Sequence, residues 1–102
     1  MPSTSDLQTF ALETLTVDNT SGGVRLTLSN ILTTPQAKAC TITQETAQMR
    51  WTKDGTAPTT SVGHLSNVGT VIFIDNPSDM VRFRAIRTGS TSATLMVSYH
   101  RW

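Results

Sequence analysis

The chain has 102 residues, a net charge of +1, and charged side chains at only 15% of its positions. A disordered chain usually carries a high net charge, and a nucleic-acid-binding domain is usually strongly basic, so neither class fits this composition. Most of the polarity comes from 19 threonine and 10 serine residues. Because threonine is β-branched and suits the exposed face of a strand, we expect one domain of β structure with a neutral, hydroxyl-rich surface.

The chain begins with a polar segment, residues 1–8, which we expect to form an arm that is ordered only where something holds it. Residues 10–17 (FALETLTV) predict a strand. Its apolar positions change parity midway, so a bulge near Glu13 is expected, with a helical turn as the alternative. Residues 18–23 (DNTSGG) have the composition of a turn. Residues 24–30 (VRLTLSN) alternate apolar and polar side chains, which predicts a strand with one buried face.

The middle of the chain predicts four more short strands separated by turns. They cover residues 38–44, 48–53, 62–65 and 71–74. In the second of them Met49 and Trp51 share one face, so Trp51 is expected in the core. The last one, VIFI, is bulky enough to be buried on both faces. The Asp-Gly pair at 54–55 and the segment 75–79 (DNPSD) predict turns.

The C-terminal part of the chain predicts a β-hairpin. Val81, Phe83 and Ala85 alternate with arginines. In the second run Ala93, Leu95, Val97 and Tyr99 alternate with Thr94, Met96, Ser98 and His100. The polar loop between these two runs, residues 88–91 (TGST), contains the glycine that a tight reversal needs. We expect this hairpin at the centre of the domain.

About eight short strands, with turns every 8–12 residues, are typical of a β-sandwich or a small barrel. The predicted fold is therefore all-β: residues 9–102 form a single-domain β-sandwich or jelly-roll-like barrel of short antiparallel strands. The pattern does not separate an up-and-down barrel, a jelly roll and an immunoglobulin-like sandwich. No segment approaches the ~20 apolar residues of a membrane-spanning helix, and no secretory leader is expected.

Catalysis is not expected from these residues. A nucleophilic triad needs a hydroxyl or thiol, a histidine and an acid close together, and neither His64 nor His100 lies beside a nucleophile motif. The single cysteine, Cys40, excludes an intrachain disulfide and leaves too few ligands for a zinc cluster. Asp75 and Asp79 can in principle ligate calcium, but a turn is the simpler interpretation. No metal and no cofactor are expected.

One concentration of basic residues lies near the C-terminus. It consists of Arg82, Arg84, Arg87, His100 and Arg101. Nucleic-acid binding usually brings a basic domain with aromatic side chains between the charges, so this nearly neutral chain is a poor candidate. If the hairpin places these side chains on one patch, a solvated face or pairing with acids of a neighbouring chain fits better.

The terminal Trp102 suits an anchor against another subunit, because tryptophan is enriched at interface hot spots. We therefore predict a subunit or partner interface. It consists of Arg82, Arg84, His100, Arg101 and Trp102.

Two segments of the C-terminal half have a distinctive pattern. The first, R-(W/Y)-x-x-D-G-T-x-P-T-x-S-x-G, consists here of Arg50, Trp51, Asp54, Gly55, Thr56, Pro58, Thr59, Ser61 and Gly63. The second, F-R-A-I-R-x-G-x-x-x-A-T-L-x-V-S-Y, consists of Phe83, Arg84, Ala85, Ile86, Arg87, Gly89, Ala93, Thr94, Leu95, Val97, Ser98 and Tyr99. With these segments, residues 50–101 resemble a family of small structural proteins encoded among the head and tail genes of tailed bacteriophages. The first 45 residues share little with that family.

The resemblance implies a virion structural protein without an active site, made in the host cytoplasm and working in the virion. The first hypothesis is a capsid decoration (cement) protein, a homotrimer that binds the major capsid protein and stabilises the head shell. The second is a tail or neck adaptor that joins tail proteins. The third hypothesis leaves assembly aside: a small carbohydrate-binding module that uses threonine and tryptophan side chains against a sugar.

Overall fold

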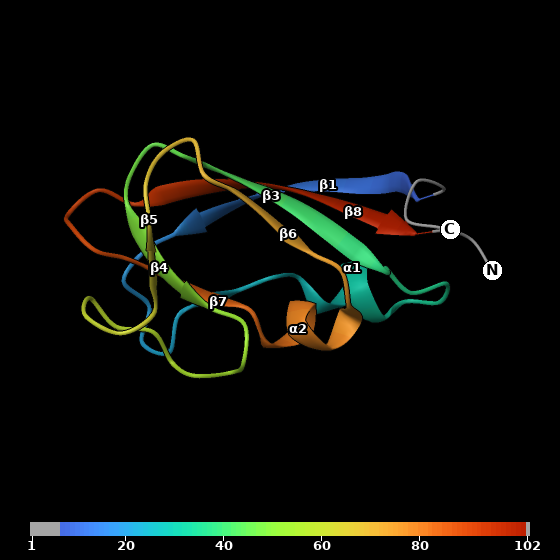
Figure 1. Ribbon diagram of the computed structural model, residues 1–102, viewed down its shortest axis with the longest axis horizontal. Coiled ribbons are helices and arrows are strands. Elements are labelled where there is room, and N and C mark those ends of the chain that lie inside the picture. Colours follow the sequence, from blue (N-terminus) through green and yellow to red (C-terminus); the bar gives the residue numbers. More distant parts are fainter. Residues whose placement is uncertain (1–6, 102) are drawn as a thin grey trace.

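The computed structural model describes residues 7–101 and is a sandwich of two antiparallel sheets (Figure 1). Sheet A has four strands in the order β1-β8-β3-β6, and sheet B has four in the order β2-β7-β4-β5. The strands of sheet A are β1 (Gln8–Val17), β8 (Ala93–Arg101), β3 (Ala39–Glu45) and β6 (Val71–Ile74). Those of sheet B are β2 (Val24–Arg25), β7 (Arg84–Arg87), β4 (Met49–Thr52) and β5 (His64–Ser66). The predicted all-β sandwich is confirmed.

Sheet A is built around β8, which pairs with β1 on one side and with β3 on the other. The alternation along β8 is regular. Ala93, Leu95, Val97 and Tyr99 are fully buried, and the residues between them are half-buried. Because successive side chains of a strand point to opposite faces, sheet A has one apolar face against the core and one polar face away from it.

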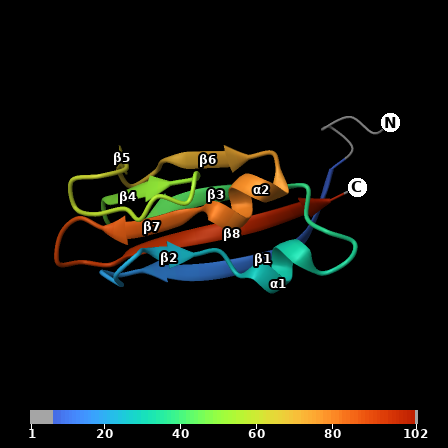
Figure 2. The ribbon, with the colours of Figure 1, turned by 90° about the horizontal axis from the view of Figure 1, so that it is seen from below.

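Two short helices complete the second layer beside sheet B. α1 (Leu28–Leu32) and α2 (Pro77–Arg82) lie next to each other under the part of sheet A that sheet B leaves uncovered (Figures 1 and 2). Each helix buries one apolar side chain, Ile31 or Met80. Within the part of the chain that the structure describes, neither helix is long and apolar enough to cross a membrane.

The core between the layers is mainly aliphatic, and Phe83 and Tyr99 are its largest fully buried side chains. Trp51 packs against this core as predicted; its ring is half-buried and lies 6.0 Å from the Phe83 ring. Gln44 is a buried polar residue that links the two sheets. Its side-chain amide donates to the Ser66 carbonyl at 2.9 Å, and the Ser66 hydroxyl donates back to Gln44 Oε1 at 2.5 Å. These bonds satisfy groups that would otherwise be costly to bury.

The predicted C-terminal hairpin is wrong, because β7 and β8 belong to different sheets. β7 pairs with β2 and β4, whereas β8 pairs with β1 and β3. The connection at residues 88–92 therefore crosses from one layer to the other, and the Arg87 side chain donates to Ser92 Oγ across it at 3.1 Å. Alternation with a period of two identifies a strand with one buried face, but it does not show which neighbour the strand pairs with.

The strand predicted over residues 24–30 is also wrong beyond its start. β2 ends at Arg25, and α1 begins at Leu28. The alternation of leucines fits a strand, but one turn of helix places Leu28 and Leu32 on one side and turns Ile31 into the core. A segment this short has too few positions to distinguish the period of a strand from the period of a helix.

The turn predicted over residues 75–79 is the start of α2. Asn76 caps the helix, since its side-chain oxygen accepts a hydrogen bond from the Asp79 backbone N–H at 2.8 Å. Pro77 occupies the first helical turn, where its missing N–H costs nothing. An asparagine cap followed by proline is a helix-start signal, so the sequence contained the information for this element. Val81, expected on a strand, lies in the helix.

β1 differs from expectation at its beginning. The register shift lies between Thr9 and Ala11, so the bulge is at Phe10 and not near Glu13. Of the predicted polar arm, Gln8 already belongs to β1, and residues 1–6 lie outside the described residues.

Candidate docking surface

The outer face of sheet A is a broad surface to which all four strands contribute, and we call it the hydroxyl face. Its central side chains are Thr14, Thr16, Thr41, Thr43, Thr94, Met96 and Ser98. The strand register arranges them in rows across the sheet: Thr14, Met96 and Thr43 are directly opposite one another on β1, β8 and β3. Their side chains point away from the core because the buried residues of β8 alternate with them.

The hydroxyl face has unused hydrogen-bonding capacity. Within residues 7–101, the hydroxyl groups of Thr16, Thr43 and Ser98 form no hydrogen bond. Thr14 donates only to the Met96 sulfur, at 3.3 Å. A hydroxyl group can both donate and accept, so this face can form several hydrogen bonds to a partner without a charge on either side.

Charged and titratable groups are confined to the ends of the hydroxyl face. Glu45 is opposite Thr94 at one end, and His100 is opposite Ala39 at the other. The His100 ring bridges three strands: Nδ1 is 2.9 Å from the Thr9 hydroxyl on β1, and Nε2 is 2.9 Å from the Thr41 hydroxyl on β3. The ring of His100, one of the residues of the predicted interface, is thus part of the face that the strands build.

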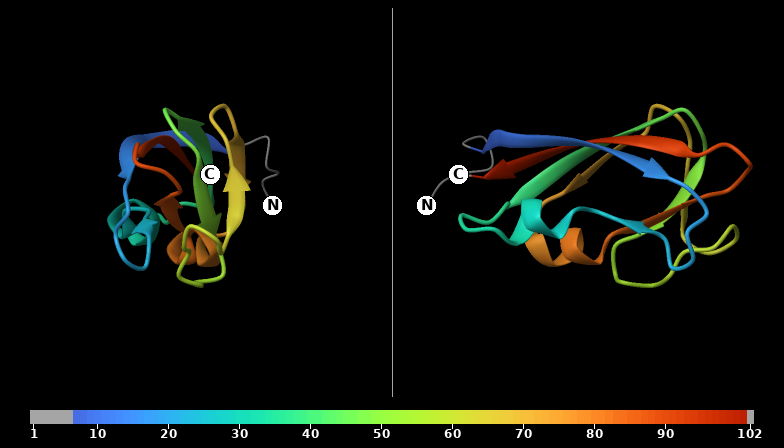
Figure 3. Two further views of the ribbon diagram at one scale, coloured as in Figure 1. Left: turned by 90° about the vertical axis from the view of Figure 1, so that its left-hand side faces the viewer. Right: turned by 180° about the vertical axis from the view of Figure 1, so that it is seen from behind.

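Large apolar side chains flank the hydroxyl face at both edges of sheet A. Leu12 on β1 is 63% exposed, and on β6 Val71 is 62% and Phe73 52% exposed. β1 and the β5–β6 segment lie on opposite sides of the sandwich (Figure 3, left; blue and yellow). The prediction that VIFI is buried on both faces is therefore wrong, since only Ile72 and Ile74 are buried. Four consecutive apolar residues carry no alternation from which an exposed face could have been recognised.

The other predicted interface residues that the structure describes belong to three different elements, β8, α2 and β7. Arg101 packs its guanidinium 4.2 Å from the Phe10 ring centroid, a cation–π contact at one end of sheet A. Arg82 forms an ion pair with Asp79 at 3.0 Å within α2. Arg84 lies in sheet B, and Trp102 lies outside the described residues. Because β7 and β8 do not form a hairpin, the condition under which these arginines would make one cationic patch is not met.

A different group of arginines lies on the outer face of sheet B. Arg25 and Arg84 are directly opposite each other in the β2–β7 pair. Their side chains bond to different segments: Arg25 Nη2 donates to the Val81 carbonyl at 2.9 Å, and Arg84 Nη1 to the Gly22 carbonyl at 3.2 Å. Arg84 Nε is buried without a hydrogen-bond partner among the described residues. These arginines hold the ends of α2 and of the β1–β2 loop, so they have a structural role.

Residues 50–63 include the loop that follows β4. The Arg50 guanidinium donates to the carbonyls of Thr60 and Gly63 at 3.0 and 2.9 Å. Asp54 accepts from the Thr56 backbone N–H at 3.0 Å, and hydrogen bonds with Thr56 hold the Asp54 pKa below its ordinary value. Thr59 Oγ1 accepts from the backbone N–H of Val62 at 3.0 Å. Arg50, Asp54 and Thr59 thus shape this loop.

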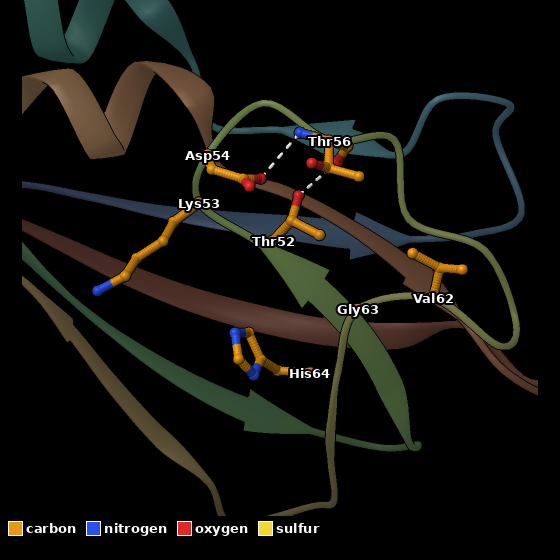
Figure 4. Close-up of a pocket in the computed structure, with 7 residues that line it drawn as sticks. All are labelled: Thr52, Lys53, Asp54, Thr56, Val62, Gly63 and His64. Atoms are coloured by element: carbon orange, nitrogen blue, oxygen red, sulfur yellow. Dashed lines mark hydrogen bonds between the residues drawn. The ribbon is translucent and has the colours of Figure 1, made fainter.

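A shallow depression of about 470 Å³ lies beside this loop. Its lining residues are Thr52, Lys53, Asp54, Thr56, Val62, Gly63 and His64 (Figure 4). Thr52 donates to the Thr56 carbonyl at 2.6 Å, and Asp54 is turned toward Thr56, so both side chains are engaged with the loop (Figure 4). The His64 ring is tilted by 40° against the Trp51 ring, with 4.8 Å between their centroids. Within residues 7–101 it has no hydrogen-bonded hydroxyl or carboxylate. This arrangement lacks the hydrogen-bonded nucleophile and base that acyl transfer needs.

A partly buried polar cluster lies on the inner side of sheet A, near the start of α1. Glu13 points inward from β1, and its carboxyl group accepts hydrogen bonds from the Tyr99 hydroxyl and from Thr27 Oγ1, the latter at 2.6 Å. Burial, with the bond to Glu13, raises the pKa of Tyr99. Burial likewise raises the pKa of the Cys40 thiol to about 12, which keeps it in the unreactive protonated form at neutral pH.

Asp18 and Asp79 are engaged in local structure. Asp79, a calcium candidate from the sequence, accepts from Arg82 and from the Asn76 side chain. Among residues 7–101, no three His, Cys, Asp or Glu side chains lie close enough together to hold a metal ion. Trp51, the tryptophan among the described residues, is half-buried and packs against Phe83 and His64.

Comparison with protein-family models, curated proteins and solved structures gave no match for this chain. The sequence prediction missed the apolar edge residues Leu12, Val71 and Phe73. The sequence contained one indication of an exposed apolar edge at β6, because residues 55–74 include no Asp, Glu, Lys or Arg.

Proposed function

We propose that this protein is a structural component of a tailed-phage virion, and that within the virion it is a capsid decoration (cement) protein. In this role it binds the outside of the head shell through the hydroxyl face and stabilises the shell. The observation that carries the proposal is the chemistry of that face: a broad, regular array of hydroxyl groups with apolar side chains at both edges and no charge at its centre.

Such a surface suits attachment to a large, repetitive protein array. Threonine offers a methyl group for packing and a hydroxyl group for hydrogen bonding, so many modest contacts can form with little desolvation of charge. When many copies bind neighbouring subunits, modest contacts add through effective concentration. The low net charge of +1 also allows copies to lie close together without strong repulsion.

The alternative within the same class is a tail or neck adaptor, which the resemblance supports equally. Both roles require binding to other virion proteins and neither requires an active site. They differ in the number of copies that a particle contains, because the head shell offers many equivalent positions and the tail offers few.

The deciding experiment is the protein content of purified virions from the phage that encodes this chain. A decoration protein should be present at a copy number comparable to that of the major capsid protein, and heads lacking it should release DNA at a lower temperature. A small fixed copy number would favour the adaptor. Absence of the protein from purified particles would contradict both roles.

A further inference from the structure

Both edges of sheet A are unpaired. β6 bonds only to β3, and β1 only to β8. Within residues 7–101, no backbone–backbone hydrogen bond joins the far side of either strand to another segment. A free strand edge presents a row of N–H and C=O groups to any other strand, so soluble proteins usually protect it with charges, prolines or bulges.

The β6 edge has none of these protections. No charged residue occurs between positions 55 and 74. Val71 and Phe73 are exposed on β6, and Leu65 and Val68 are exposed beside it at 51% and 59%. An edge with this composition is a predicted site of association.

The β1 edge is protected only in its first part. The bulge at Phe10 interrupts the ladder near the start of the strand. The inward-pointing Glu13 is engaged with Tyr99 and Thr27 on the core side. From Leu12 to Val17 the register is regular, and the outward side chains, Leu12, Thr14 and Thr16, are uncharged. This stretch is long enough to pair with the four residues of β6.

The directions of the strands decide how two copies can meet. Each neighbouring pair in sheet A is antiparallel, so across its four strands β6 runs opposite to β1. Copies placed side by side in the same orientation therefore continue the antiparallel alternation, with β6 of one copy next to β1 of the following copy.

We infer that this protein assembles with copies of itself head-to-tail, each β6 pairing with the Leu12–Val17 part of β1 in the next copy, to form a closed ring. A head-to-tail contact closes into a ring when its rotation permits. Charge favours a second copy as the occupant, because neither edge carries an outward charge that would attract a charged partner or repel another copy. The position of Leu12 argues against a two-fold contact in which the β6 strands of two copies pair with each other. Such a contact would leave Leu12 uncovered, whereas the head-to-tail contact places Leu12 beside Val71 and Phe73.

Two edge variants test this inference. Leu12→Lys places a charge on the β1 edge, and Phe73→Lys places one on the β6 edge; Thr60→Lys, in the loop over sheet B, is the matched control. The mass in solution is measured by light scattering after size exclusion, against the 11.1 kDa of one chain. We expect the wild type and Thr60→Lys to have the same multiple of this mass. Each edge variant alone should be monomeric, and an equimolar mixture of the two should form a dimer, because one intact β6 edge meets one intact β1 edge.

Several outcomes would overturn the inference. A monomeric wild type would do so, and so would a Leu12→Lys variant that still assembles, which would indicate pairing through β6 alone. A mixture that stays monomeric would show that the two edges are not partners. Circular dichroism and thermal melting establish that each variant is folded. If either is not, Thr16→Lys and Val71→Lys replace them at the same edges. Ring formation is measured on the purified protein, without virions. A negative result would therefore contradict the ring and leave the proposed virion function to its own test.

Discussion

Glu13 shows how one side chain fixes the position of several elements. From β1 it accepts hydrogen bonds from Tyr99 on β8 and from both the hydroxyl and the backbone N–H of Thr27, the latter at 3.3 Å. Thr27 is the residue that precedes α1, and α1 has no side-chain cap of its own. The Glu13 carboxyl group therefore ties the start of this helix to sheet A.

Replacement of Glu13 with alanine should destabilise the domain markedly. The substitution leaves the Tyr99 hydroxyl without its acceptor in a buried position, which typically costs about 1–3 kcal/mol. Each kcal/mol lowers the melting temperature of a domain of this size by about 4–8 °C. The matched control is Thr14→Ala, on the opposite face of the same strand, which should change stability by no more than about 0.5 kcal/mol. Chemical denaturation measures both, and equal stability of the two variants would contradict the role assigned to Glu13.

For single residues, the sequence predicted which apolar side chains are buried better than it predicted which way polar side chains point. The alternation of β8 correctly placed Leu95, Val97 and Tyr99 in the core, and Trp51 was correctly expected there. The inward direction of Glu13 was not predicted, because the bulge that sets the parity of β1 lies at Phe10. A bulge leaves no reliable mark in apolar positions when the strand mixes threonine with leucine.

At the scale of elements, Gly63 at the end of the loop of residues 53–63 has both a positive φ and close neighbours. Gly63 has φ +121°, and a Cβ atom there would lie 3.1 Å from the Trp51 carbonyl oxygen and 3.3 Å from Arg50 Cβ. Two other glycines provide comparisons. Gly69 has φ +95° with nothing within 4 Å, and Gly89 has neither a positive φ nor a close neighbour.

Alanine at these three glycines should therefore give an ordered series of stabilities. Gly89→Ala should be neutral or stabilising by about 0.4–1 kcal/mol, because it restricts the unfolded chain. Gly69→Ala should cost about 1–2 kcal/mol for the left-handed backbone. Gly63→Ala should cost more, since the close contacts add to the backbone strain. Thermal melting measures the series, and Gly63→Ala as stable as Gly89→Ala would show that the loop rearranges freely.

The sequence predicted elements whose bounds depend on their own residues. It did not predict which strands pair with each other. The range of β6 was predicted without error and β3 to within one residue at each end. The helix α2 could have been predicted from Asn76 and Pro77. The placement of β7 and β8 in separate sheets could not, because residues 88–92 look like a turn whether they join neighbours or cross between layers.

At the scale of the whole molecule, the two outer surfaces differ in chemistry. Sheet A presents uncharged hydroxyl groups, whereas sheet B presents Arg25, Arg50 and Arg84. Head-to-tail pairing would extend the hydroxyl face from one copy into the next, so a ring would offer a continuous docking surface. The proposed ring and the proposed attachment to the head shell through the hydroxyl face are therefore physically compatible. Each of them can be tested without the other.

The identity of the docking surface can be tested on heads that lack this protein. Thr43→Lys puts a charge at the centre of the hydroxyl face and should abolish binding, whereas Thr60→Lys on the opposite side should bind like the wild type. Sedimentation of protein with heads measures both.

Salt dependence provides a second test of the same surface. Raising the salt concentration from about 0.1 M to about 1 M shortens the screening length from about 10 Å to about 3 Å, which weakens contacts between exposed charges. Attachment through the hydroxyl face involves no charge at its centre, so the affinity for heads should change little across this range. A steep loss of binding with salt, together with normal binding of Thr43→Lys, would show that the arginines of sheet B make the contact instead.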